Sequence, residues 1–160
     1  MSKFTIEAYS LPLIGGTASH NFWVLRDSDG NVAAELHGLA TNRETGQPEA
    51  IGSSEKAYSL SIWHIVHDQA YLGKGSNPTE TTSKEFGSYI NPDAPNEVMF
   101  IGSKEEALAR WNSAVDAMPM INSFDLDYPG LGVSIVKDTV NSNSTYRTLG
   151  EIMGLAIVSF

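Results

Sequence analysis

The four residues 27–30, with the sequence DSDG, constrain the fold of this chain more than any other stretch. An Asp-Gly step between two short β-prone runs is a strong hairpin signal, because these residues tolerate the backbone angles of a tight turn. The flanking runs, 20–26 (HNFWVLR) and 32–37 (VAAELH), are therefore predicted to pair as antiparallel strands. The hairpin also determines which of their side chains share a face of the sheet.

A loop of this length sets Arg26 opposite Asn31 and His20 opposite His37, with Glu35 as a diagonal neighbour of His20. Side chains alternate between the two faces of a strand, so the two histidines and the glutamate fall on one face. A loop of a different length would shift this pairing by a residue or two. A histidine beside a carboxylate or a second imidazole is the usual pairing of a base with its orienting group. The hairpin thus predicts an acid–base cluster.

The period of the apolar residues predicts the remaining elements. Strands are expected at 4–9, 58–66, 97–101 and 133–136, and helices are expected to begin at the capping box of Ser103 and near Ser142. The polar stretches 39–56 and 73–96, which contain Gly and Pro, are predicted to be loops. Nothing divides the chain, so we expect residues 1–160 to form one α+β domain, a small antiparallel sheet packed against two or more helices.

Large apolar side chains at helical spacing indicate the core. Trp111 falls on the buried face of the first predicted helix, and Trp23 on the hairpin is also expected in the core. The last helix is expected to bury one face, made of Tyr146, Leu149, Ile152 or Met153, and Ala156.

Composition limits the classes of function. The chain has 160 residues, of which 41% are hydrophobic and 18% charged, which is typical of a globular protein. A net charge of −9 argues against nucleic acid as a partner, since phosphate binding needs clustered Lys and Arg. No stretch approaches the roughly 18 apolar residues of a membrane span, and residues 1–20 lack the apolar core of a signal peptide. We therefore expect a protein that does not span a membrane, is cytoplasmic as synthesised, and reaches other compartments only by a signal-peptide-independent route.

The segment 140–155 (VNSNSTYRTLGEIMGL) places Asn and Ser residues at the mouth of the last predicted helix. Asn141, Asn143 and Ser144 suit capping, because their side chains accept hydrogen bonds from the first N–H groups of a helix. The same helix end concentrates N–H groups and positive dipole, which suits a nucleophile or an oxyanion. Both interpretations stay open on these residues alone.

These features together resemble a known group of folds: an early strand with Ser-His, a partner on the next strand, and a late Asn-x-Asn-Ser motif that opens a helix. The chain resembles the circularly permuted papain-like folds, which include NlpC-type peptidoglycan peptidases and lecithin:retinol acyltransferase. The resemblance covers mainly residues 18–38 and 140–153. It implies that His20 is the base, that Glu35 or His37 orients it, and that Ser142 is the nucleophile. It also implies that the helix mouth at Asn141, Asn143 and Ser144 holds an oxyanion.

The chain departs from these families at Ser142, where they have cysteine, and it contains no cysteine at all. A serine hydroxyl titrates far above neutral pH and needs a base in the transition state, whereas a thiolate is stabilised at a helix N-terminus. Three interpretations follow: Ser142 is a working nucleophile, it replaces an original cysteine, or the fold serves binding alone.

The resemblance implies a hydrolase or acyltransferase acting on an amide or ester bond, with a peptide, glycopeptide or lipid substrate and no cofactor. A bacterial secreted antibacterial effector, with an immunity or carrier protein as partner, fits this description. The alternative is a catalytically inactive binding module of the same fold, associated with a phage or an effector.

Metal binding is the other chemistry that the histidines allow. His20, His37 and Glu35 could form a two-histidine, one-carboxylate site, but the resemblance offers no metal, so acid–base use is preferred. His64 and His67 look like a ligand pair, yet residues three apart on a strand point to opposite faces. We therefore expect no metal at either place.

Overall fold

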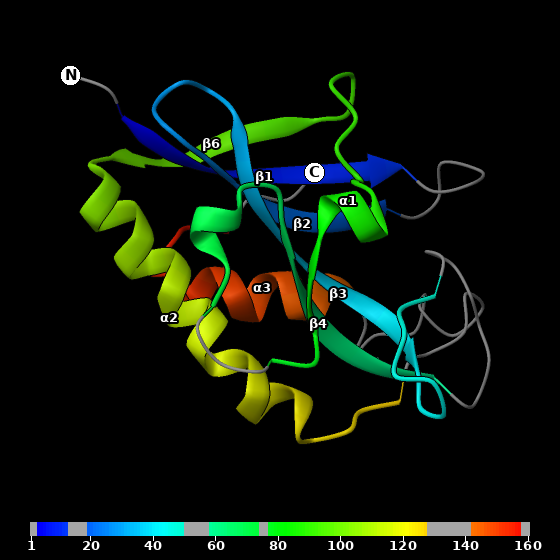
Figure 1. Cartoon of the computed structure of the whole chain (residues 1–160). Coiled ribbons are helices and arrows are strands. Elements are labelled where there is room, and N and C mark those ends of the chain that lie inside the picture. The colour runs from blue at the N-terminus through cyan, green and yellow to red at the C-terminus, as the bar shows by residue number, and fades with distance from the viewer. Residues whose placement is uncertain (1–2, 13–18, 50–57, 74–76, 128–141, 158–160) are drawn as a thin grey trace.

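The computed structural model describes residues 3–12, 19–49, 58–73, 77–127 and 142–157. These residues form a six-stranded sheet in the order β5-β4-β3-β2-β1-β6 (Figure 1). The strands are β1 (Phe4–Pro12), β2 (Ser19–Arg26), β3 (Val32–Asn42), β4 (Tyr58–Val66), β5 (Glu80–Thr82) and β6 (Asn96–Gly102). The helices are α1 (Ser83–Phe86), α2 (Lys104–Asn122) and α3 (Ser142–Ile152), with a short 3-10 turn, η2 (Gln69–Tyr71).

The α+β class is confirmed, and the sheet is antiparallel except at one edge. Neighbouring strands pair antiparallel from β6 through to β4, and only β4 with β5 is parallel. The connection from β4 to β5 contains η2, and β5 runs parallel to the last three residues of β4. The sheet is therefore mixed rather than purely antiparallel.

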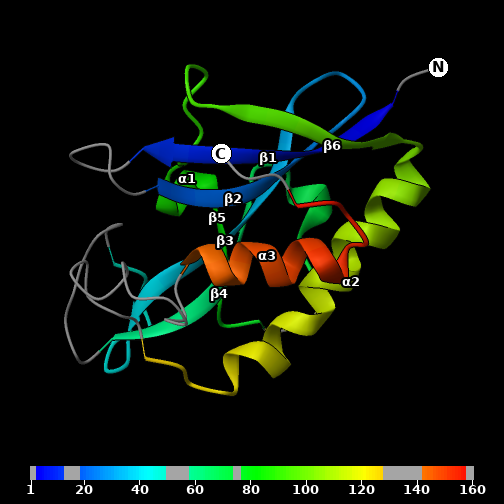
Figure 2. The same cartoon turned by 180° about the vertical axis from the view of Figure 1, so that it is seen from behind.

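The two faces of the sheet are covered by different parts of the chain. Helices α2 and α3 lie on one face, and α1 with the residues after it lies on the other (Figures 1 and 2). The helical side holds the main core, in which Trp23, Trp111 and Tyr146 are among the largest buried side chains. The opposite side holds a smaller cluster built on Tyr9, Phe22 and Val24. The prediction that Trp23 and Trp111 belong to the core is confirmed.

The hairpin is confirmed, but its predicted register is wrong by two residues. Val24 pairs with Glu35, and Trp23 pairs with Leu36. The N–H of Asp27 donates to the carbonyl oxygen of Asn31 (2.9 Å), so the loop is shorter than predicted. A bulge between Leu25 and Arg26 adds the second residue of displacement. Because the displacement is even, every side chain stays on its predicted face.

The polar composition of two segments was misleading. Residues 39–42 continue β3 rather than forming a loop, because they pair with residues 58–61 of β4 and bury Leu39 and Ala40. Within the predicted loop 73–96 the chain forms β5 and α1. In β3 and β5 cross-strand pairing outweighs weak intrinsic β-propensity, and the hydroxyl of Thr82 caps α1. The predicted strand at 133–136 lies outside the described residues.

Both long helices occur where they were predicted. The hydroxyl of Ser103 caps α2 by accepting from the N–H of Glu106 (3.1 Å). Helix α3 buries Tyr146 and Leu149, followed by Met153. The prediction that Ala156 shares this helical face is wrong, because the helix ends at Ile152 and Gly154 (φ 72°) turns the chain away.

Two glycines allow α3 to approach the sheet closely. A Cβ atom on Gly38 of β3 would lie 2.7 Å from the Cβ of Thr145, and one on Gly150 would lie 2.6 Å from the Trp23 ring. Small residues are therefore needed on both sides of this contact, and the position of α3 against β2 and β3 is tightly set.

We predict that Gly38→Ala lowers the free energy of unfolding by about 1–3 kcal/mol, because the added methyl group forces α3 away from β3. Urea denaturation measures the change. Thr148→Ala, on the exposed face of the same helix, is the control and should change stability by less than about 0.5 kcal/mol. Equal stability of Gly38→Ala and the wild type would show that α3 is not held at this distance.

Candidate active site

Three predicted site residues meet on the face of the sheet opposite α2 and α3. His20 comes from β2, and Glu35 and His37 come from β3. All three are buried, with exposed fractions of 1%, 0% and 0%. The alternation of side chains along the two strands brings them together, as the sequence predicted.

The three side chains form a continuous hydrogen-bonded chain. Nε2 of His20 lies 2.8 Å from Nδ1 of His37, and Nε2 of His37 lies 2.8 Å from Oε1 of Glu35. His37 therefore contacts His20 directly, and Glu35 acts on His20 only through His37. The sequence left open whether Glu35 or His37 orients His20. In the structure His37 contacts His20, and Glu35 contacts His37 from the far side.

Glu35 also receives donors that the sequence analysis did not find. Oε2 accepts from Nε2 of His67 (2.5 Å) and from the hydroxyl of Ser88 (2.7 Å), and the N–H of Tyr89 lies 3.4 Å from Oε1. His67 follows β4, and Ser88 follows α1. For the position of His67, the only signal in the sequence was the strand alternation that puts His64 and His67 on opposite faces. For Ser88 there was no signal, because the polar composition of residues 73–96 predicts a loop.

The protonation states follow from these contacts. Burial raises the pKa of Glu35, but the hydrogen bonds from His37, His67 and Ser88 outweigh it and lower that pKa to about 2. Burial lowers the pKa of His20 well below its usual value, and the neighbouring His37 lowers it further, against the opposing effect of Glu35. Burial also lowers the pKa of His37, although Glu35 opposes the shift. Glu35 is thus charged and both imidazoles are neutral at neutral pH.

A charged carboxylate can only accept, so Nε2 of His37 carries a proton and its Nδ1 does not. Nδ1 of His37 then accepts from Nε2–H of His20. A neutral imidazole has one proton, so Nδ1 of His20 is left with a free lone pair. The hydrogen-bonded chain therefore ends in a basic nitrogen.

Aromatic rings shield the hydrogen-bonded chain of His20, His37 and Glu35 from water. Phe22 stacks on both imidazoles, with ring centroids 5.6 Å from His20 and 4.3 Å from His37. Tyr89, from the segment after α1, covers the same two rings at 5.9 and 4.9 Å. Phe86 packs against Tyr89 in turn, with ring centroids 5.6 Å apart. The segment that covers this face thus provides both the desolvation and two donors to Glu35.

The start of α3 is attached to the strand that carries His20. Oδ1 of Asn143 accepts from the N–H of Asn21, and its Nδ2 donates to the carbonyl oxygen of Ser19, both at 3.0 Å. Asn143 therefore binds the backbone on either side of His20 and holds the helix against β2. Ser144 is half-buried one residue further along α3. Asn141 and the side chain of Ser142 lie outside the described residues.

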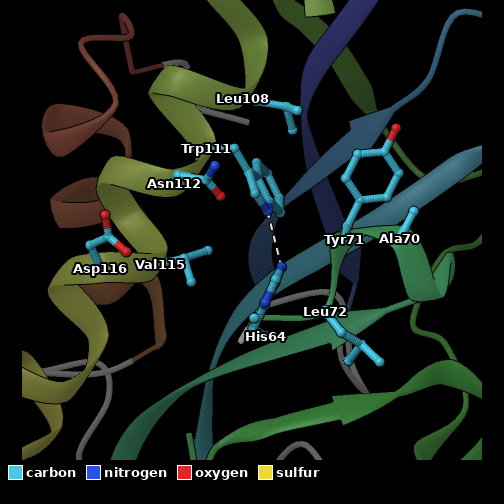
Figure 3. A pocket seen from close by; sticks show the side chains of 10 residues that line it. His64, Ala70, Tyr71, Leu72, Leu108, Trp111, Asn112, Val115 and Asp116 are labelled. Atoms are coloured by element: carbon cyan, nitrogen blue, oxygen red, sulfur yellow. Dashed lines mark hydrogen bonds between the residues drawn. The ribbon is translucent and has the colours of Figure 1, made fainter. Parts of the chain in front are cut away.

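A second histidine–carboxylate pair lies on the helical face. Nδ1 of His64 is 2.9 Å from Oε2 of Glu80, and Trp111 donates its indole N–H to Nε2 of His64 (3.0 Å, Figure 3). The two rings border a cavity of about 230 Å³ between α2 and residues 70–73. Both nitrogens of His64 are committed, which leaves no base there. His64 and His67 bind different carboxylates on opposite faces, which confirms that they do not form a pair.

Other classes of site can be addressed on the described part of the chain. In these residues no three His, Asp or Glu side chains are arranged to hold a metal ion. No helix within the same ranges is long and apolar enough to cross a membrane. No protein family, curated protein or solved structure matches the chain. The geometry of the His20, His37 and Glu35 chain is thus the basis for assigning a function.

We predict that the free energy of unfolding falls as the pH drops below about 6.5, the usual pKa of histidine. The pKa values of His20 and His37 are lowered in the folded protein, so acid protonates the unfolded chain first. Glu35, whose pKa falls from 4.5 to about 2, contributes on the order of 3 kcal/mol that is lost between these values.

Urea unfolding between about pH 8 and about pH 2 measures both the histidine and the Glu35 dependence. His20→Gln, which cannot titrate, is the comparison and should reduce the loss of stability below about pH 6.5. A wild type and variant with identical pH dependence would contradict the assignment of a neutral, buried His20.

Proposed function

We propose that this protein is a hydrolase or acyltransferase that acts on an amide or ester bond, with Ser142 as nucleophile and His20 as general base. One observation carries the proposal. The buried chain from Glu35 through His37 ends at His20, near the start of β2, and Asn143 attaches the start of α3 to the backbone on either side of His20. Helix α3 packs on the other face of that strand, and Ser142 is its first residue, so the proposal requires the Ser142 hydroxyl to reach Nδ1 of His20 past the start of β2.

These residues can account for each proton transfer in such a reaction. The Ser142 hydroxyl gives its proton to Nδ1 of His20 while its oxygen bonds to the substrate carbonyl carbon. His20 becomes an imidazolium whose Nε2–H donates to His37, and the charge of Glu35 stabilises it through His37. When the intermediate collapses, the bond to the leaving amine or alcohol breaks and the leaving group takes the proton from Nδ1. Water or an acceptor alcohol or amine then repeats the sequence on the acyl-enzyme.

The helix end supplies the remaining requirement. The N-terminus of a helix carries partial positive charge from the helix dipole. At the start of α3 this charge favours the negatively charged oxygen of a tetrahedral intermediate.

Glu35 offers a reason why serine can replace cysteine. A thiolate forms readily beside an imidazolium, whereas a hydroxyl keeps its proton until the transition state and demands a strong, oriented base. A buried carboxylate behind the second imidazole opposes the lowering of the His20 pKa by burial and by His37, and it fixes the tautomer of His20. This feature supports a working Ser142, because it leaves Nδ1 of His20 without a proton and able to accept one from a hydroxyl.

The resemblance to permuted papain-like enzymes suggests the substrate class. We propose a peptide bond of peptidoglycan or an acyl bond of a lipid. A secreted antibacterial effector with an immunity or carrier protein is the setting that we propose for either reaction.

We predict that Ser142→Ala and His20→Ala each reduce turnover by about 10³-fold or more, as removal of a nucleophile or base does in serine hydrolases. Peptidoglycan fragments and phospholipids are the substrates, and release of a new amine or fatty acid is the measurement. A fluorophosphonate probe should label the wild type and neither variant. Thr148→Ala, exposed on the same helix, should react normally. Undiminished turnover in both site variants would refute the mechanism.

A second prediction needs no substrate. Ser142→Cys should fold and gain a thiol whose pKa lies at least about one unit below the ordinary 8.5, because the helix end and His20 both favour a thiolate. Alkylation rate against pH measures the thiol pKa. Thr148→Cys is the matched control, on the exposed face of the same helix beyond its first turn, and should titrate near 8.5. Equal pKa values for the two thiols would mean that His20 does not act on residue 142.

A further inference from the structure

Glu35 divides its two oxygens between two histidines. Oε1 faces His37, which leads to His20, and Oε2 faces His67 and the Ser88 hydroxyl. The three donors come from three separate segments of the chain: β3, the residue after β4, and the segment after α1. The orientation of the carboxylate therefore depends on both of its oxygens being held.

His67 is the most firmly held of the donors to Oε2. Its backbone N–H donates to the carbonyl oxygen of Ala33 (2.9 Å), which extends the sheet ladder past the end of β4. Its side chain is 21% exposed, in contrast to the fully buried Glu35 and His37. His67 and the more exposed Ser88 are thus two points at which the buried network reaches the surface in the described part of the chain.

We propose that His67 is a positioning residue for the base. By holding Oε2, it keeps Oε1 directed at Nε2–H of His37, and so fixes the tautomer of His37 and then of His20. The ionisable groups around it are Glu35 and His37 of β3 and its chain neighbour Asp68, and of these Glu35 is in hydrogen-bond contact. His67 does not touch the reacting atoms and acts only through Glu35.

Without the donor from His67, the carboxylate has one firm hydroxyl contact on Oε2 and can rotate away from His37. His37 then loses the partner that selects Nε2–H, and its Nδ1–H form gains population. In that form Nδ1 of His37 no longer accepts from His20, so Nε2 of His20 becomes the acceptor and Nδ1 the protonated nitrogen. The lone pair of His20 would then lie on Nε2, facing His37, and Nδ1 could no longer accept a proton.

The test is ¹H–¹⁵N NMR of the imidazoles, which reports the tautomer of each of the four histidines in the 160-residue chain. We expect His20 and His37 to carry their protons on Nε2 in the wild type. His67→Leu, which removes the donor, should raise the Nδ1–H fraction of His37 about tenfold, the effect of losing a hydrogen bond to a charged group. His67→Gln, which keeps an N–H donor, should restore most of the wild-type pattern.

Two further variants make the result decisive. Ser88→Ala removes the other donor to Oε2 from a more exposed position and should produce a smaller shift of the same kind, even if His67→Leu fails to fold. His64→Gln disrupts the other histidine–carboxylate pair on the opposite face and should leave the tautomers of His20 and His37 unchanged. A purely structural role of His67 would lower stability without moving the tautomers. Unaltered tautomers in folded His67→Leu or, where that variant does not fold, in Ser88→Ala would overturn the proposal.

The positioning role of His67 rests on the proposed function only for the use that His20 makes of its lone pair. The positioning role and the proposed function can therefore fail separately. Absence of turnover and probe labelling with normal tautomer shifts would refute the hydrolase and retain the role of His67. Normal turnover with unaltered tautomers in the folded variant would retain the hydrolase and refute the role of His67. If both hold, the rate of labelling by the fluorophosphonate should fall about tenfold in His67→Leu and recover in His67→Gln.

Discussion

The carboxylate of Glu35 is the group on which the arrangement of this face of the sheet depends. A buried charge is strongly unfavourable unless hydrogen bonds replace its hydration, and Glu35 obtains them from two imidazoles, a hydroxyl and a backbone N–H. These donors belong to β3, to the end of β4, and to the segment after α1. The same charge therefore fixes how that segment covers the sheet and which nitrogen of His20 is basic.

The two histidine–carboxylate systems of the protein illustrate how similar parts acquire different roles. His64 has Glu80 on one nitrogen and the indole N–H of Trp111 on the other, so its ring is saturated and serves the core. His20 has a second histidine in place of a carboxylate, and its other nitrogen is left as a base. The difference lies in how many partners each ring has rather than in its burial, which is nearly the same.

The sequence was sufficient for the parts of the fold that depend on local pattern. Strand alternation placed His20, Glu35 and His37 on one face, and the capping residue Ser103 located α2. The register of the hairpin could not be read, because a bulge leaves no trace in composition. The involvement of His67 and Ser88 could not be found either, since each reaches Glu35 from a segment more than 30 residues away. Long-range partners of a buried charge are set by the tertiary fold, and a single sequence does not encode them in any periodic signal.

The attachment of Asn143 to the strand of His20 has a consequence for biosynthesis. These hydrogen bonds join residues that are 122 and 124 positions apart, among the longest separations in the structure. Domains are made from the N-terminus, and contacts of high sequence separation form late because closing the intervening loop is entropically unfavourable. The sheet with its histidines can thus assemble while the nucleophile candidate is still inside the ribosome. The active site that we propose would therefore be completed only after α3 has been synthesised.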